Sequence, residues 1–464
     1  MEDTTLSEQP LFCLPPELVA SQQTSSAARV MSTARVMSAR VMTARVMSTS
    51  SPTSRTPGMN DGLILPESYK TAPTLSRVMV AAAPEREQPL RGEIKLIVVL
   101  AEFTDHQFAA GAKDHLKDLF FSKGKIATGS VTEYYSEVSG GLVNLTGEVV
   151  GPFQLPHTAA YYANGNSGLG SAYPNSRTMA DDALTAMGAG TDFSPYDNDG
   201  NGLVDGFIVV HSGPNGAKTS NKDDIWSVKW FLPKERLVDG GVKVYAFLTV
   251  AQDATLGVCA HELGHLLFGW PDLYDTDGSS SGTGNWCLMG TGTSGQGGTR
   301  PVHPSAWCKS KQGWVDVVNE TTNHQVTVED VKTGKKVHRL WRNGDAGNEY
   351  FLVENRVTTD FDGALPGAGL LVWHIDESVG SNTDEQHPKV GLLQADGLSQ
   401  LQIKSGRGDR GDPFPGSSNN VSLTSTSNPD SKSYSGEDTF VSITSIPAAS
   451  SFMTVDITVK PVDV

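Results

Sequence analysis

The amino-acid sequence predicts an α+β domain followed by an all-β, sandwich-like domain, and two observations support this prediction. In the middle of the chain, buried-strand and helix patterns alternate, and they lie at residues 94–101, 175–188, 207–210, 242–251 and 253–268. After about Trp314 helical periodicity almost disappears, and short apolar runs between Gly, Asp, Asn and Ser indicate strands at 349–353, 369–374, 390–394 and 452–459. We therefore expect the two domains at residues 93–316 and 317–464.

Within the α+β domain, each expected element has a local signal. Residues 94–101 form an almost continuous apolar run, which is typical of a central strand. The helix at 175–188 has apolar residues near helical spacing and two glycines that can end it. Residues 242–251 alternate well enough for a strand, and we expect this strand to align an extended substrate by edge pairing. The helix at 253–268 is expected to begin with Asp253 as its N-cap.

Residues 1–92 differ from the rest of the chain in composition. The tetrapeptide Ala-Arg-Val-Met occurs at residues 28–31, 34–37, 39–42 and 44–47, in a stretch rich in Ser, Thr and Ala. A repeat period of five or six residues is too short for a packed solenoid unit. The low complexity predicts a mostly disordered arm, which we interpret as a pro-segment or a linker.

The composition excludes several classes of function. The chain has 52 Asp and Glu residues against 36 Lys and Arg, a net charge of −16, whereas nucleic acid requires a basic surface. No apolar run approaches the roughly 18 residues needed to span a bilayer. With only four cysteines there is no disulfide framework, and one bridge or free buried thiols among Cys259, Cys287 and Cys308 both remain open. We expect a monomer with no nucleic-acid partner and no transmembrane segment.

The main chemical signal is His261-Glu262-Leu263-Gly264-His265, in the helix expected at 253–268. Residues four apart share one face of a helix, so the two imidazoles can bind one zinc ion at about 2.0–2.1 Å. Glu262 lies beside them and can accept a proton from a water whose pKa zinc lowers toward about 7. The alternative, a polar patch on a solvated face, fits poorly because the helix is otherwise apolar. The motif predicts zinc-dependent hydrolysis of peptide bonds in protein or peptide substrates.

A catalytic zinc ion usually has a third protein ligand and keeps its fourth position for water. Gly269 allows a sharp turn after the helix, and Asp272 then follows as the first candidate for the third ligand. Asp275 is the alternative, and either carboxylate can instead cap backbone N–H groups or bind calcium. Met289 lies two dozen residues after the second histidine, where we expect a Met-turn that supports the zinc site from below.

These residues resemble the immune inhibitor A family of metallopeptidases, peptidase family M6. The resemblance continues through other segments and covers roughly residues 93–416; the segments include Leu100–Asp105, Val209–Pro214, Glu349–Arg356, Leu371–Asp376 and Asp412–Gly416. It implies a zincin, metzincin-like fold and secreted zinc endopeptidases of broad protein specificity, often made as zymogens. Secretion is therefore expected, although no signal peptide is legible after Met1.

The turn that carries the third ligand departs from the metzincin-like pattern by one residue. Such sites place the glycine three residues after the second histidine and the ligand six after it. Here Gly269 is four residues and Asp272 seven residues after His265, as though Phe268 were inserted. The spacing from Gly269 to Asp272 is kept, so the turn can simply begin later.

A second, structural metal site is expected at Asp197, Asp199, Asn201 and Asp205, which place oxygen atoms at positions 1, 3, 5 and 9 of a calcium loop. Two glycines within the loop permit tight curvature. The glutamate that would close a full helix–loop–helix site is absent, because position 12 is Ile208. The alternative is an Asx-rich turn that precedes the next strand.

Several other features leave alternatives open. The Arg-Gly-Asp triplets at 407–409 and 410–412 support a rival reading, a catalytically inactive, calcium-stabilised adhesion protein with a relic zinc site. Intact Glu262 argues against that rival. A zinc amidase acting on cell-wall peptides is a second rival function.

A Cys13 thiolate can occupy the fourth zinc position of a latent enzyme, although an unremarkable cysteine is the simpler reading. His374 can bind a metal or form an ordinary hydrogen bond within its strand.

Overall fold

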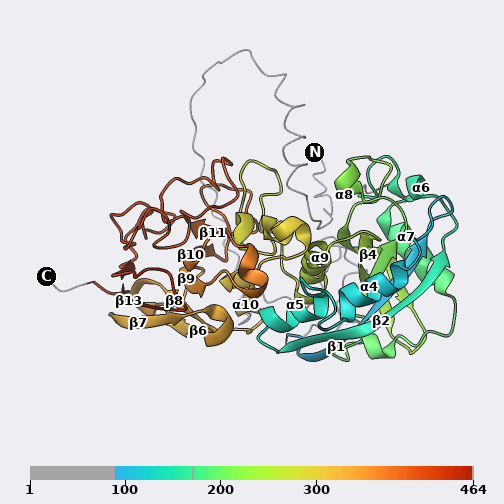
Figure 1. Cartoon of the computed structure of the whole chain (residues 1–464), viewed down its shortest axis with the longest axis horizontal. Helices are drawn as coiled ribbons and strands as arrows, with labels where there is room; N and C mark the ends of the chain where they lie inside the picture. The colour runs from blue at the N-terminus through green and yellow to red at the C-terminus, as the bar shows by residue number, and fades with distance from the viewer. Residues whose placement is uncertain (1–88, 170–171, 462–464) are drawn as a thin grey trace, which may run out of the picture.

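The computed structural model describes residues 89–169 and 172–461 (Figure 1). Most of the arm expected at residues 1–92, Cys13 included, lies outside these ranges. One five-stranded sheet lies within residues 92–251, and two further sheets lie within residues 316–458. Figure 1 shows the two groups of strands on opposite sides of helix α9 (Leu256–Phe268).

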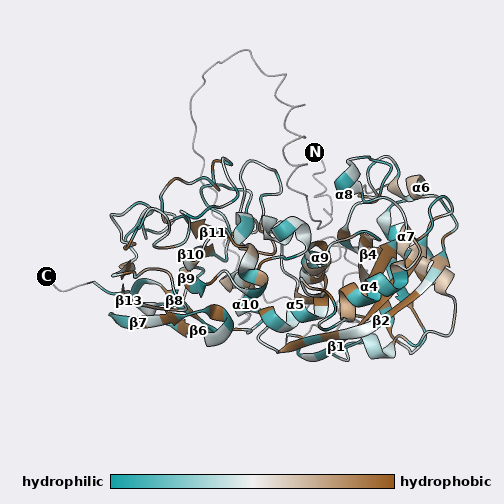
Figure 2. Ribbon diagram, viewed as in Figure 1, coloured by the Kyte–Doolittle hydropathy of each residue, from teal (hydrophilic) through white to brown (hydrophobic). Residues whose placement is uncertain are grey.

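The first sheet has the strand order β2-β1-β3-β5-β4. Its strands are β1 (Gly92–Glu102), β2 (Val143–Gln154), β3 (Phe207–His211), β4 (Val228–Leu237) and β5 (Lys243–Ala251). The first four in this order run parallel, and β4 runs antiparallel to β5. The strands expected at 94–101, 207–210 and 242–251 correspond to β1, β3 and β5. Figure 2 shows the apolar residues concentrated on these strands and on α9.

The prediction that residues 242–251 form an edge strand is wrong. The strand exists, but β5 lies between β3 and β4 and is buried along almost its whole length. The two outer strands are β2 and β4, and β4, which pairs with β5, was not predicted from the sequence. Pro233 and the three charged residues that follow it interrupt the apolar pattern of β4. The pairing of β4 with β5 shifts register between Phe231 and Arg236.

Helices cover this sheet and connect its strands. The longer ones are α4 (Ala112–Phe121), α5 (Val131–Val138) and α7 (Ser176–Met187), and the short ones are α6 (Ala159–Ala163) and α8 (Gly216–Thr219). Helices α4 and α5 pack on β2, and α9 contacts α5, β4 and β5. The helix expected at 175–188 is α7, whose N-cap Asn175 accepts hydrogen bonds from two backbone N–H groups and which ends at Gly188.

Helix α9 begins later than the sequence analysis predicted. Its N-cap is Thr255, and the expected cap, Asp253, lies outside the helix. The reason is a tight turn after β5, in which the Ala254 N–H donates to the Ala251 carbonyl. The Asp253 carboxylate instead forms a 2.7 Å ion pair with Lys218.

The C-terminal part contains a five-stranded sheet of order β11-β10-β9-β8-β6 and a three-stranded sheet of order β12-β13-β7. The strands are β6 (Asp316–Asn319), β7 (His324–Glu329), β8 (Lys336–Leu340), β9 (Glu349–Arg356), β10 (Gly369–Asp376), β11 (Val390–Leu393), β12 (Ser442–Thr444) and β13 (Phe452–Thr458). Each of the four strands expected after Trp314 is present. Short helices α10 (Ala306–Lys311) and α11 (Val331–Gly334) flank β6 and β7. The mixed α and β content agrees with the expected class, whereas the zincin assignment and an independent all-β domain stay predictions.

Five short 3-10 segments complete the described structure, and they are η1 (Ser194–Tyr196), η2 (Gly284–Trp286), η3 (Thr291–Gly298), η4 (Arg342–Gly344) and η5 (Asp360–Ala364). None of the helices in the described residues is both long enough and apolar enough to cross a bilayer.

Candidate metal centre

Helix α9 places His261 and His265 one turn apart on the same buried face. Both side chains are fully buried, and their Nε2 atoms lie 3.0 Å apart. The ring planes are nearly perpendicular, so the two nitrogens converge on a shared point while the rings avoid stacking. This convergence is the arrangement in which two helical histidines bind one metal ion.

The turn after the helix brings Asp272 to the two histidines. Gly269 ends α9 in the left-handed conformation, with φ of 62°, and the chain then reverses toward the helix. Asp272 Oδ1 lies 3.1 Å from His261 Nε2 and 3.1 Å from His265 Nε2. Ligands of a tetrahedral zinc ion lie about 3.3 Å from one another, so this triangle of donor atoms has nearly the size that zinc requires.

Hydrogen bonds on the far side of each ring fix the histidine tautomers. His261 Nδ1 lies 3.1 Å from the Leu288 carbonyl, and His265 Nδ1 lies 2.5 Å from the Trp270 carbonyl. A carbonyl can only accept, so each Nδ1 carries the proton and each Nε2 presents a lone pair. Two lone pairs and a carboxylate oxygen then face one another at about 3 Å, and a cation between them removes the repulsion. The donor set therefore fits a zinc ion.

The pKa shifts at these three residues reflect burial and mutual contact. Burial alone would raise the pKa of Asp272, but the two histidines hold it at about 2. Burial lowers the pKa of His265 below its ordinary value. In His261 burial has the same effect, but contact with Asp272 and the charge of Glu262 outweigh it and raise the pKa. An ionised carboxylate and neutral imidazoles are the forms that bind a metal.

Glu262 follows His261 on α9 and is fully buried beside the pair. Its charge is close enough to raise the pKa of His261, which places the carboxylate next to the histidines without making it a member of the ligand triangle. That is the position expected for a general base that handles the proton of a metal-activated water.

Met289, the residue predicted to form a Met-turn, packs against helix α9 beside the two histidines. A β-carbon on Gly264 would be 2.9 Å from the Met289 sulfur, so the thioether packs against α9 between the two histidines. The Met289 carbonyl accepts hydrogen bonds from the N–H groups of Leu273 and Tyr274, next to Asp272. The same residue thus supports the helix and holds the turn that carries the third ligand.

The structure does not bring Asp275 into this triangle. Its carboxylate accepts hydrogen bonds from the Asp277 N–H, the Ser279 hydroxyl and the Ser280 N–H, at 2.7–3.1 Å. Asp275 is therefore positioned as a cap for the loop that follows.

The expected calcium loop folds as a tight turn after η1. Asp197, Asp199 and Asp205 bring one carboxylate oxygen each within 4.8 Å of one another. Asn201 lies beside them, with its Nδ2 donating to Asp199 and its Oδ1 accepting from the Leu203 N–H. Asn198 fastens the loop to β1 through two hydrogen bonds with the backbone of Lys95.

The remaining candidates have structural partners. His374 forms a 2.9 Å contact with Glu349 and stacks on Tyr434 at 3.8 Å, as expected for an ordinary strand histidine. The three cysteines among the described residues are free and buried.

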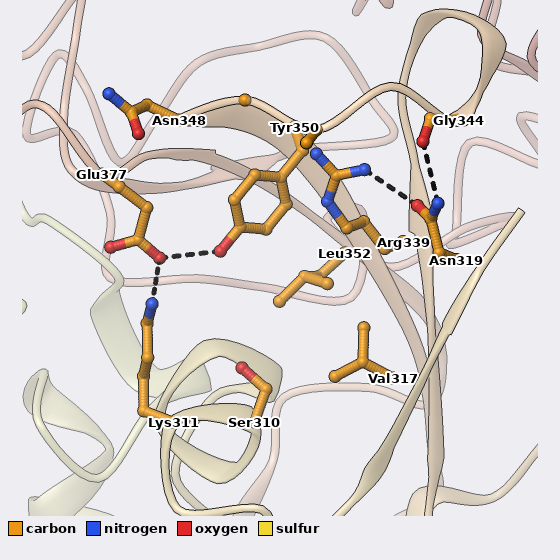
Figure 3. Close-up of a pocket in the computed structure, with 12 residues that line it drawn as sticks. Ser310, Lys311, Val317, Asn319, Arg339, Gly344, Asn348, Tyr350, Leu352 and Glu377 are labelled. Atoms are coloured by element: carbon orange, nitrogen blue, oxygen red, sulfur yellow. Dashed lines mark hydrogen bonds and ion pairs between the residues drawn. The ribbon is translucent and has the colours of Figure 1, made fainter. Parts of the chain in front are cut away.

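A pocket of about 400 Å³ lies between α10 and β9, where Lys311 and the Tyr350 hydroxyl both contact Glu377 (Figure 3). No expected metal ligand lines this pocket.

The sequence analysis missed two groups of residues. One is the buried ion-pair network of Arg356, Glu354 and Asp362, which joins β9 to the backbone of His303. The other is a third carboxylate cluster, formed by Asp396, Asp409 and Asp412. The available signal for the cluster was the repeated aspartate of the two Arg-Gly-Asp triplets.

The paired histidines, the adjacent glutamate and the carboxylate from the following turn define the active-site class of a metallopeptidase. A sequence profile of the immune inhibitor A peptidase M6 catalytic domain matches residues 101–318. The chain is therefore similar to peptidase family M6 over residues 101–318, a region that contains α9 and Met289.

Two relatives illustrate the similarity. The pre-pro-metalloprotease PrtV of Vibrio cholerae serotype O1 is 29% identical over 247 residues, which is 45% of this chain and 27% of the relative. Immune inhibitor A of Bacillus thuringiensis subsp. alesti is 31% identical over 269 residues, which is 46% of this chain and 39% of the relative. The similarity thus spans well under half of each relative's length.

Proposed function

We propose that the protein is a zinc endopeptidase that hydrolyses peptide bonds in proteins. His261, His265 and Asp272 hold the zinc ion, and Glu262 is the general base. The observation that carries this proposal is the triangle of donor atoms, 3.0–3.1 Å on each side, with both Nδ1 atoms bound to backbone carbonyls. The match of residues 101–318 to the M6 catalytic-domain profile supports it independently.

The side chains divide the chemistry between them. Bound zinc supplies Lewis acidity, which polarises the scissile carbonyl and acidifies the attacking water. Glu262 removes a proton from that water and then delivers it to the nitrogen of the leaving amine. The Leu288 and Trp270 carbonyls keep the imidazoles in the ligating tautomer, and Met289 holds the floor of the site.

We further propose that β4 aligns the substrate. This strand is one of the two outer strands of the sheet and contacts α9, so an extended peptide pairing with it would pass close to the proposed metal ligands. Specificity for side chains then depends on the surface around β4.

The loop of Asp197, Asp199, Asn201 and Asp205 is proposed to bind a structural calcium ion. Three converging carboxylates on a tight turn with glycines at φ of 74° and 86° support this assignment. Residues 1–92 are proposed to be a pro-segment, residues 93–316 the catalytic domain and residues 317–464 a supporting β-rich domain. The family resemblance, and the name pre-pro-metalloprotease of one relative, support a zymogen that is active outside the cell.

The test is casein cleavage by the purified chain, with and without a zinc chelator. Cleavage should stop with the chelator and return with added zinc. Glu262→Gln should retain one zinc ion per chain and lose cleavage, whereas the partly exposed control Glu385→Gln should match the wild type. Cleavage that survives the chelator, or that Glu262→Gln retains, would refute the mechanism.

Latency is tested by repeating the assay after removal of residues 1–88, which leaves the buried Leu90 and strand β1 in place. A gain of cleavage identifies these residues as a pro-segment. A zinc-loaded chain that cleaves nothing in either form favours the inactive binding protein with a relic site.

A further inference from the structure

The two Arg-Gly-Asp triplets end in residues that meet a third aspartate. Asp409 and Asp412 are the last residues of the triplets, and Asp396 follows β11. One carboxylate oxygen from each of the three lies within 4.8 Å of the others. Segments more than ten residues apart in sequence thus converge on one point.

The glycines of the triplets make this convergence sterically allowed. A β-carbon on Gly411 would lie 2.3 Å from Asp396 Oδ2 and 3.0 Å from Asp409 Oδ1, so any side chain there would fill the space between the carboxylates. A β-carbon on Gly408 would lie 2.4 Å from Trp286 Nε1. The repeated glycine therefore serves close packing around the cluster.

Asp412 provides a second observation, independent of the clustering. Its side chain is fully buried, and its Oδ2 accepts hydrogen bonds from Trp286 Nε1 at 2.8 Å and from the Asp409 N–H at 3.1 Å. Its Oδ1 is buried and has no hydrogen-bond partner among the described residues. A buried carboxylate oxygen without a donor, beside two other carboxylates, is unfavourable unless a cation or a proton neutralises the charge.

We propose that Asp396, Asp409 and Asp412 bind a divalent cation, and that this cation is calcium. Every side-chain donor in the cluster is a carboxylate oxygen, which Ca²⁺ prefers over the nitrogen and sulfur donors suited to zinc. The residues come from irregular loops, and these tolerate the flexible coordination of Ca²⁺ better than the strict octahedron of Mg²⁺.

The cation connects this loop to the floor of the zinc site. Asp412 is bonded to Trp286, and the Asn285 N–H donates to the Arg407 carbonyl at 2.7 Å, three and four residues before Met289. Bound calcium thus holds residues 407–412 against the segment that supports α9. The second triplet does not present its aspartate for cell adhesion, because Asp412 is buried.

Terbium, a luminescent substitute for calcium, tests the site in the full-length zinc-loaded chain. Trp286 contacts the cluster directly, so excitation of tryptophan should give terbium emission that calcium suppresses by competition. Asp412→Asn should lose this emission and bind one calcium ion fewer per chain by calorimetry. Asp396→Asn, a half-exposed position less important for folding, should do the same.

Two controls separate this site from others. The exposed variant Asp438→Asn should keep the emission, and Asp197→Asn, in the other carboxylate loop, should keep the Trp286-dependent part of it. The proposal is overturned if Asp396→Asn and Asp412→Asn bind as many calcium ions as the wild type. It is also overturned if only Asp197→Asn abolishes the emission.

Discussion

The sulfur of Met289 lies against Gly264, the residue that precedes His265, the second of the two proposed metal-binding histidines. A β-carbon at Gly264 would be 2.9 Å from that sulfur and 3.0 Å from the Trp270 ring. The Met289 carbonyl also accepts hydrogen bonds from the Leu273 and Tyr274 N–H groups. Met289 therefore packs against helix α9 and also holds the turn that carries Asp272. The absence of a side chain at position 264 is thus part of the metal site.

Gly264→Ala should therefore weaken both the fold and the zinc site. The added methyl group forces Met289 and Trp270 apart, and overpacking of this kind costs about 1–3 kcal/mol of unfolding free energy. Chemical denaturation and competition with a zinc chelator measure the two effects. Gly380→Ala, where a β-carbon meets nothing within 4 Å, is the control. Equal stability and zinc affinity in the two variants would show that the contact is unimportant.

Asp272→Asn and Asp275→Asn should differ sharply in zinc affinity. Asp272 faces both histidines, whereas Asp275 accepts hydrogen bonds within its own loop. Loss of an outer-shell partner alone lowers metal affinity about 10–100-fold, so loss of a direct ligand should exceed that. Competition with a chromogenic chelator gives both constants. If Asp275→Asn shows the larger loss, the third ligand has been assigned to the wrong residue.

His211 should make the protein less stable in acid. The residue is fully buried at the end of β3, neither ring nitrogen has a hydrogen-bond partner among the described residues, and burial lowers its pKa from 6.5 to about 3. The unfolded chain then binds more protons between these values. The contribution of neutral His211 is complete above pH 6.5 and is lost as the pH falls, at up to roughly 1.4 kcal/mol per pH unit.

Urea unfolding at several pH values, with excess chelator to remove the contribution of zinc, measures this effect. His211→Gln should show a flatter loss of stability below about pH 6.5. The exposed control His324→Gln should keep the wild-type slope. An unchanged slope in His211→Gln would mean that another group controls acid unfolding.

Arg356→Met should destabilise the C-terminal part strongly. The guanidinium is fully buried between Glu354 and Asp362, and its removal leaves two buried carboxylates unpaired. Breaking such a group costs about 3–5 kcal/mol. Arg342→Met removes a partly exposed pair with Glu437 and should cost about 0–1 kcal/mol. Denaturation midpoints that differ little between the two variants would contradict this expectation.

The convergence of His261, His265 and Asp272 could be predicted from the sequence because the signal is local. His261 and His265 share a helix face, and Asp272 follows within one turn, so spacing alone brings them together. Strands β1 and β3 can also be predicted from the sequence, because both are buried on two faces and appear as nearly continuous apolar runs.

Features that depend on packing between distant segments cannot be predicted from local sequence patterns. Pro233 and several charged residues break the apolar pattern of β4. Residues 242–251, which form β5, were therefore predicted at the edge of the sheet instead. The start of α9 depends on the turn at Ala251–Ala254, and its N-cap residue Thr255 makes no side-chain capping hydrogen bond. The cluster at Asp396 and Asp412 forms only because their loops pack against Trp286.

The most direct test of the central claim is an anomalous difference map at the zinc absorption edge from a crystal of the zinc-loaded chain. We expect one strong peak bonded to His261 Nε2, His265 Nε2 and Asp272, with no comparable peak at Asp396 or Asp197. Absence of a peak among the first three residues, or a zinc ion bound elsewhere in the chain, would contradict it.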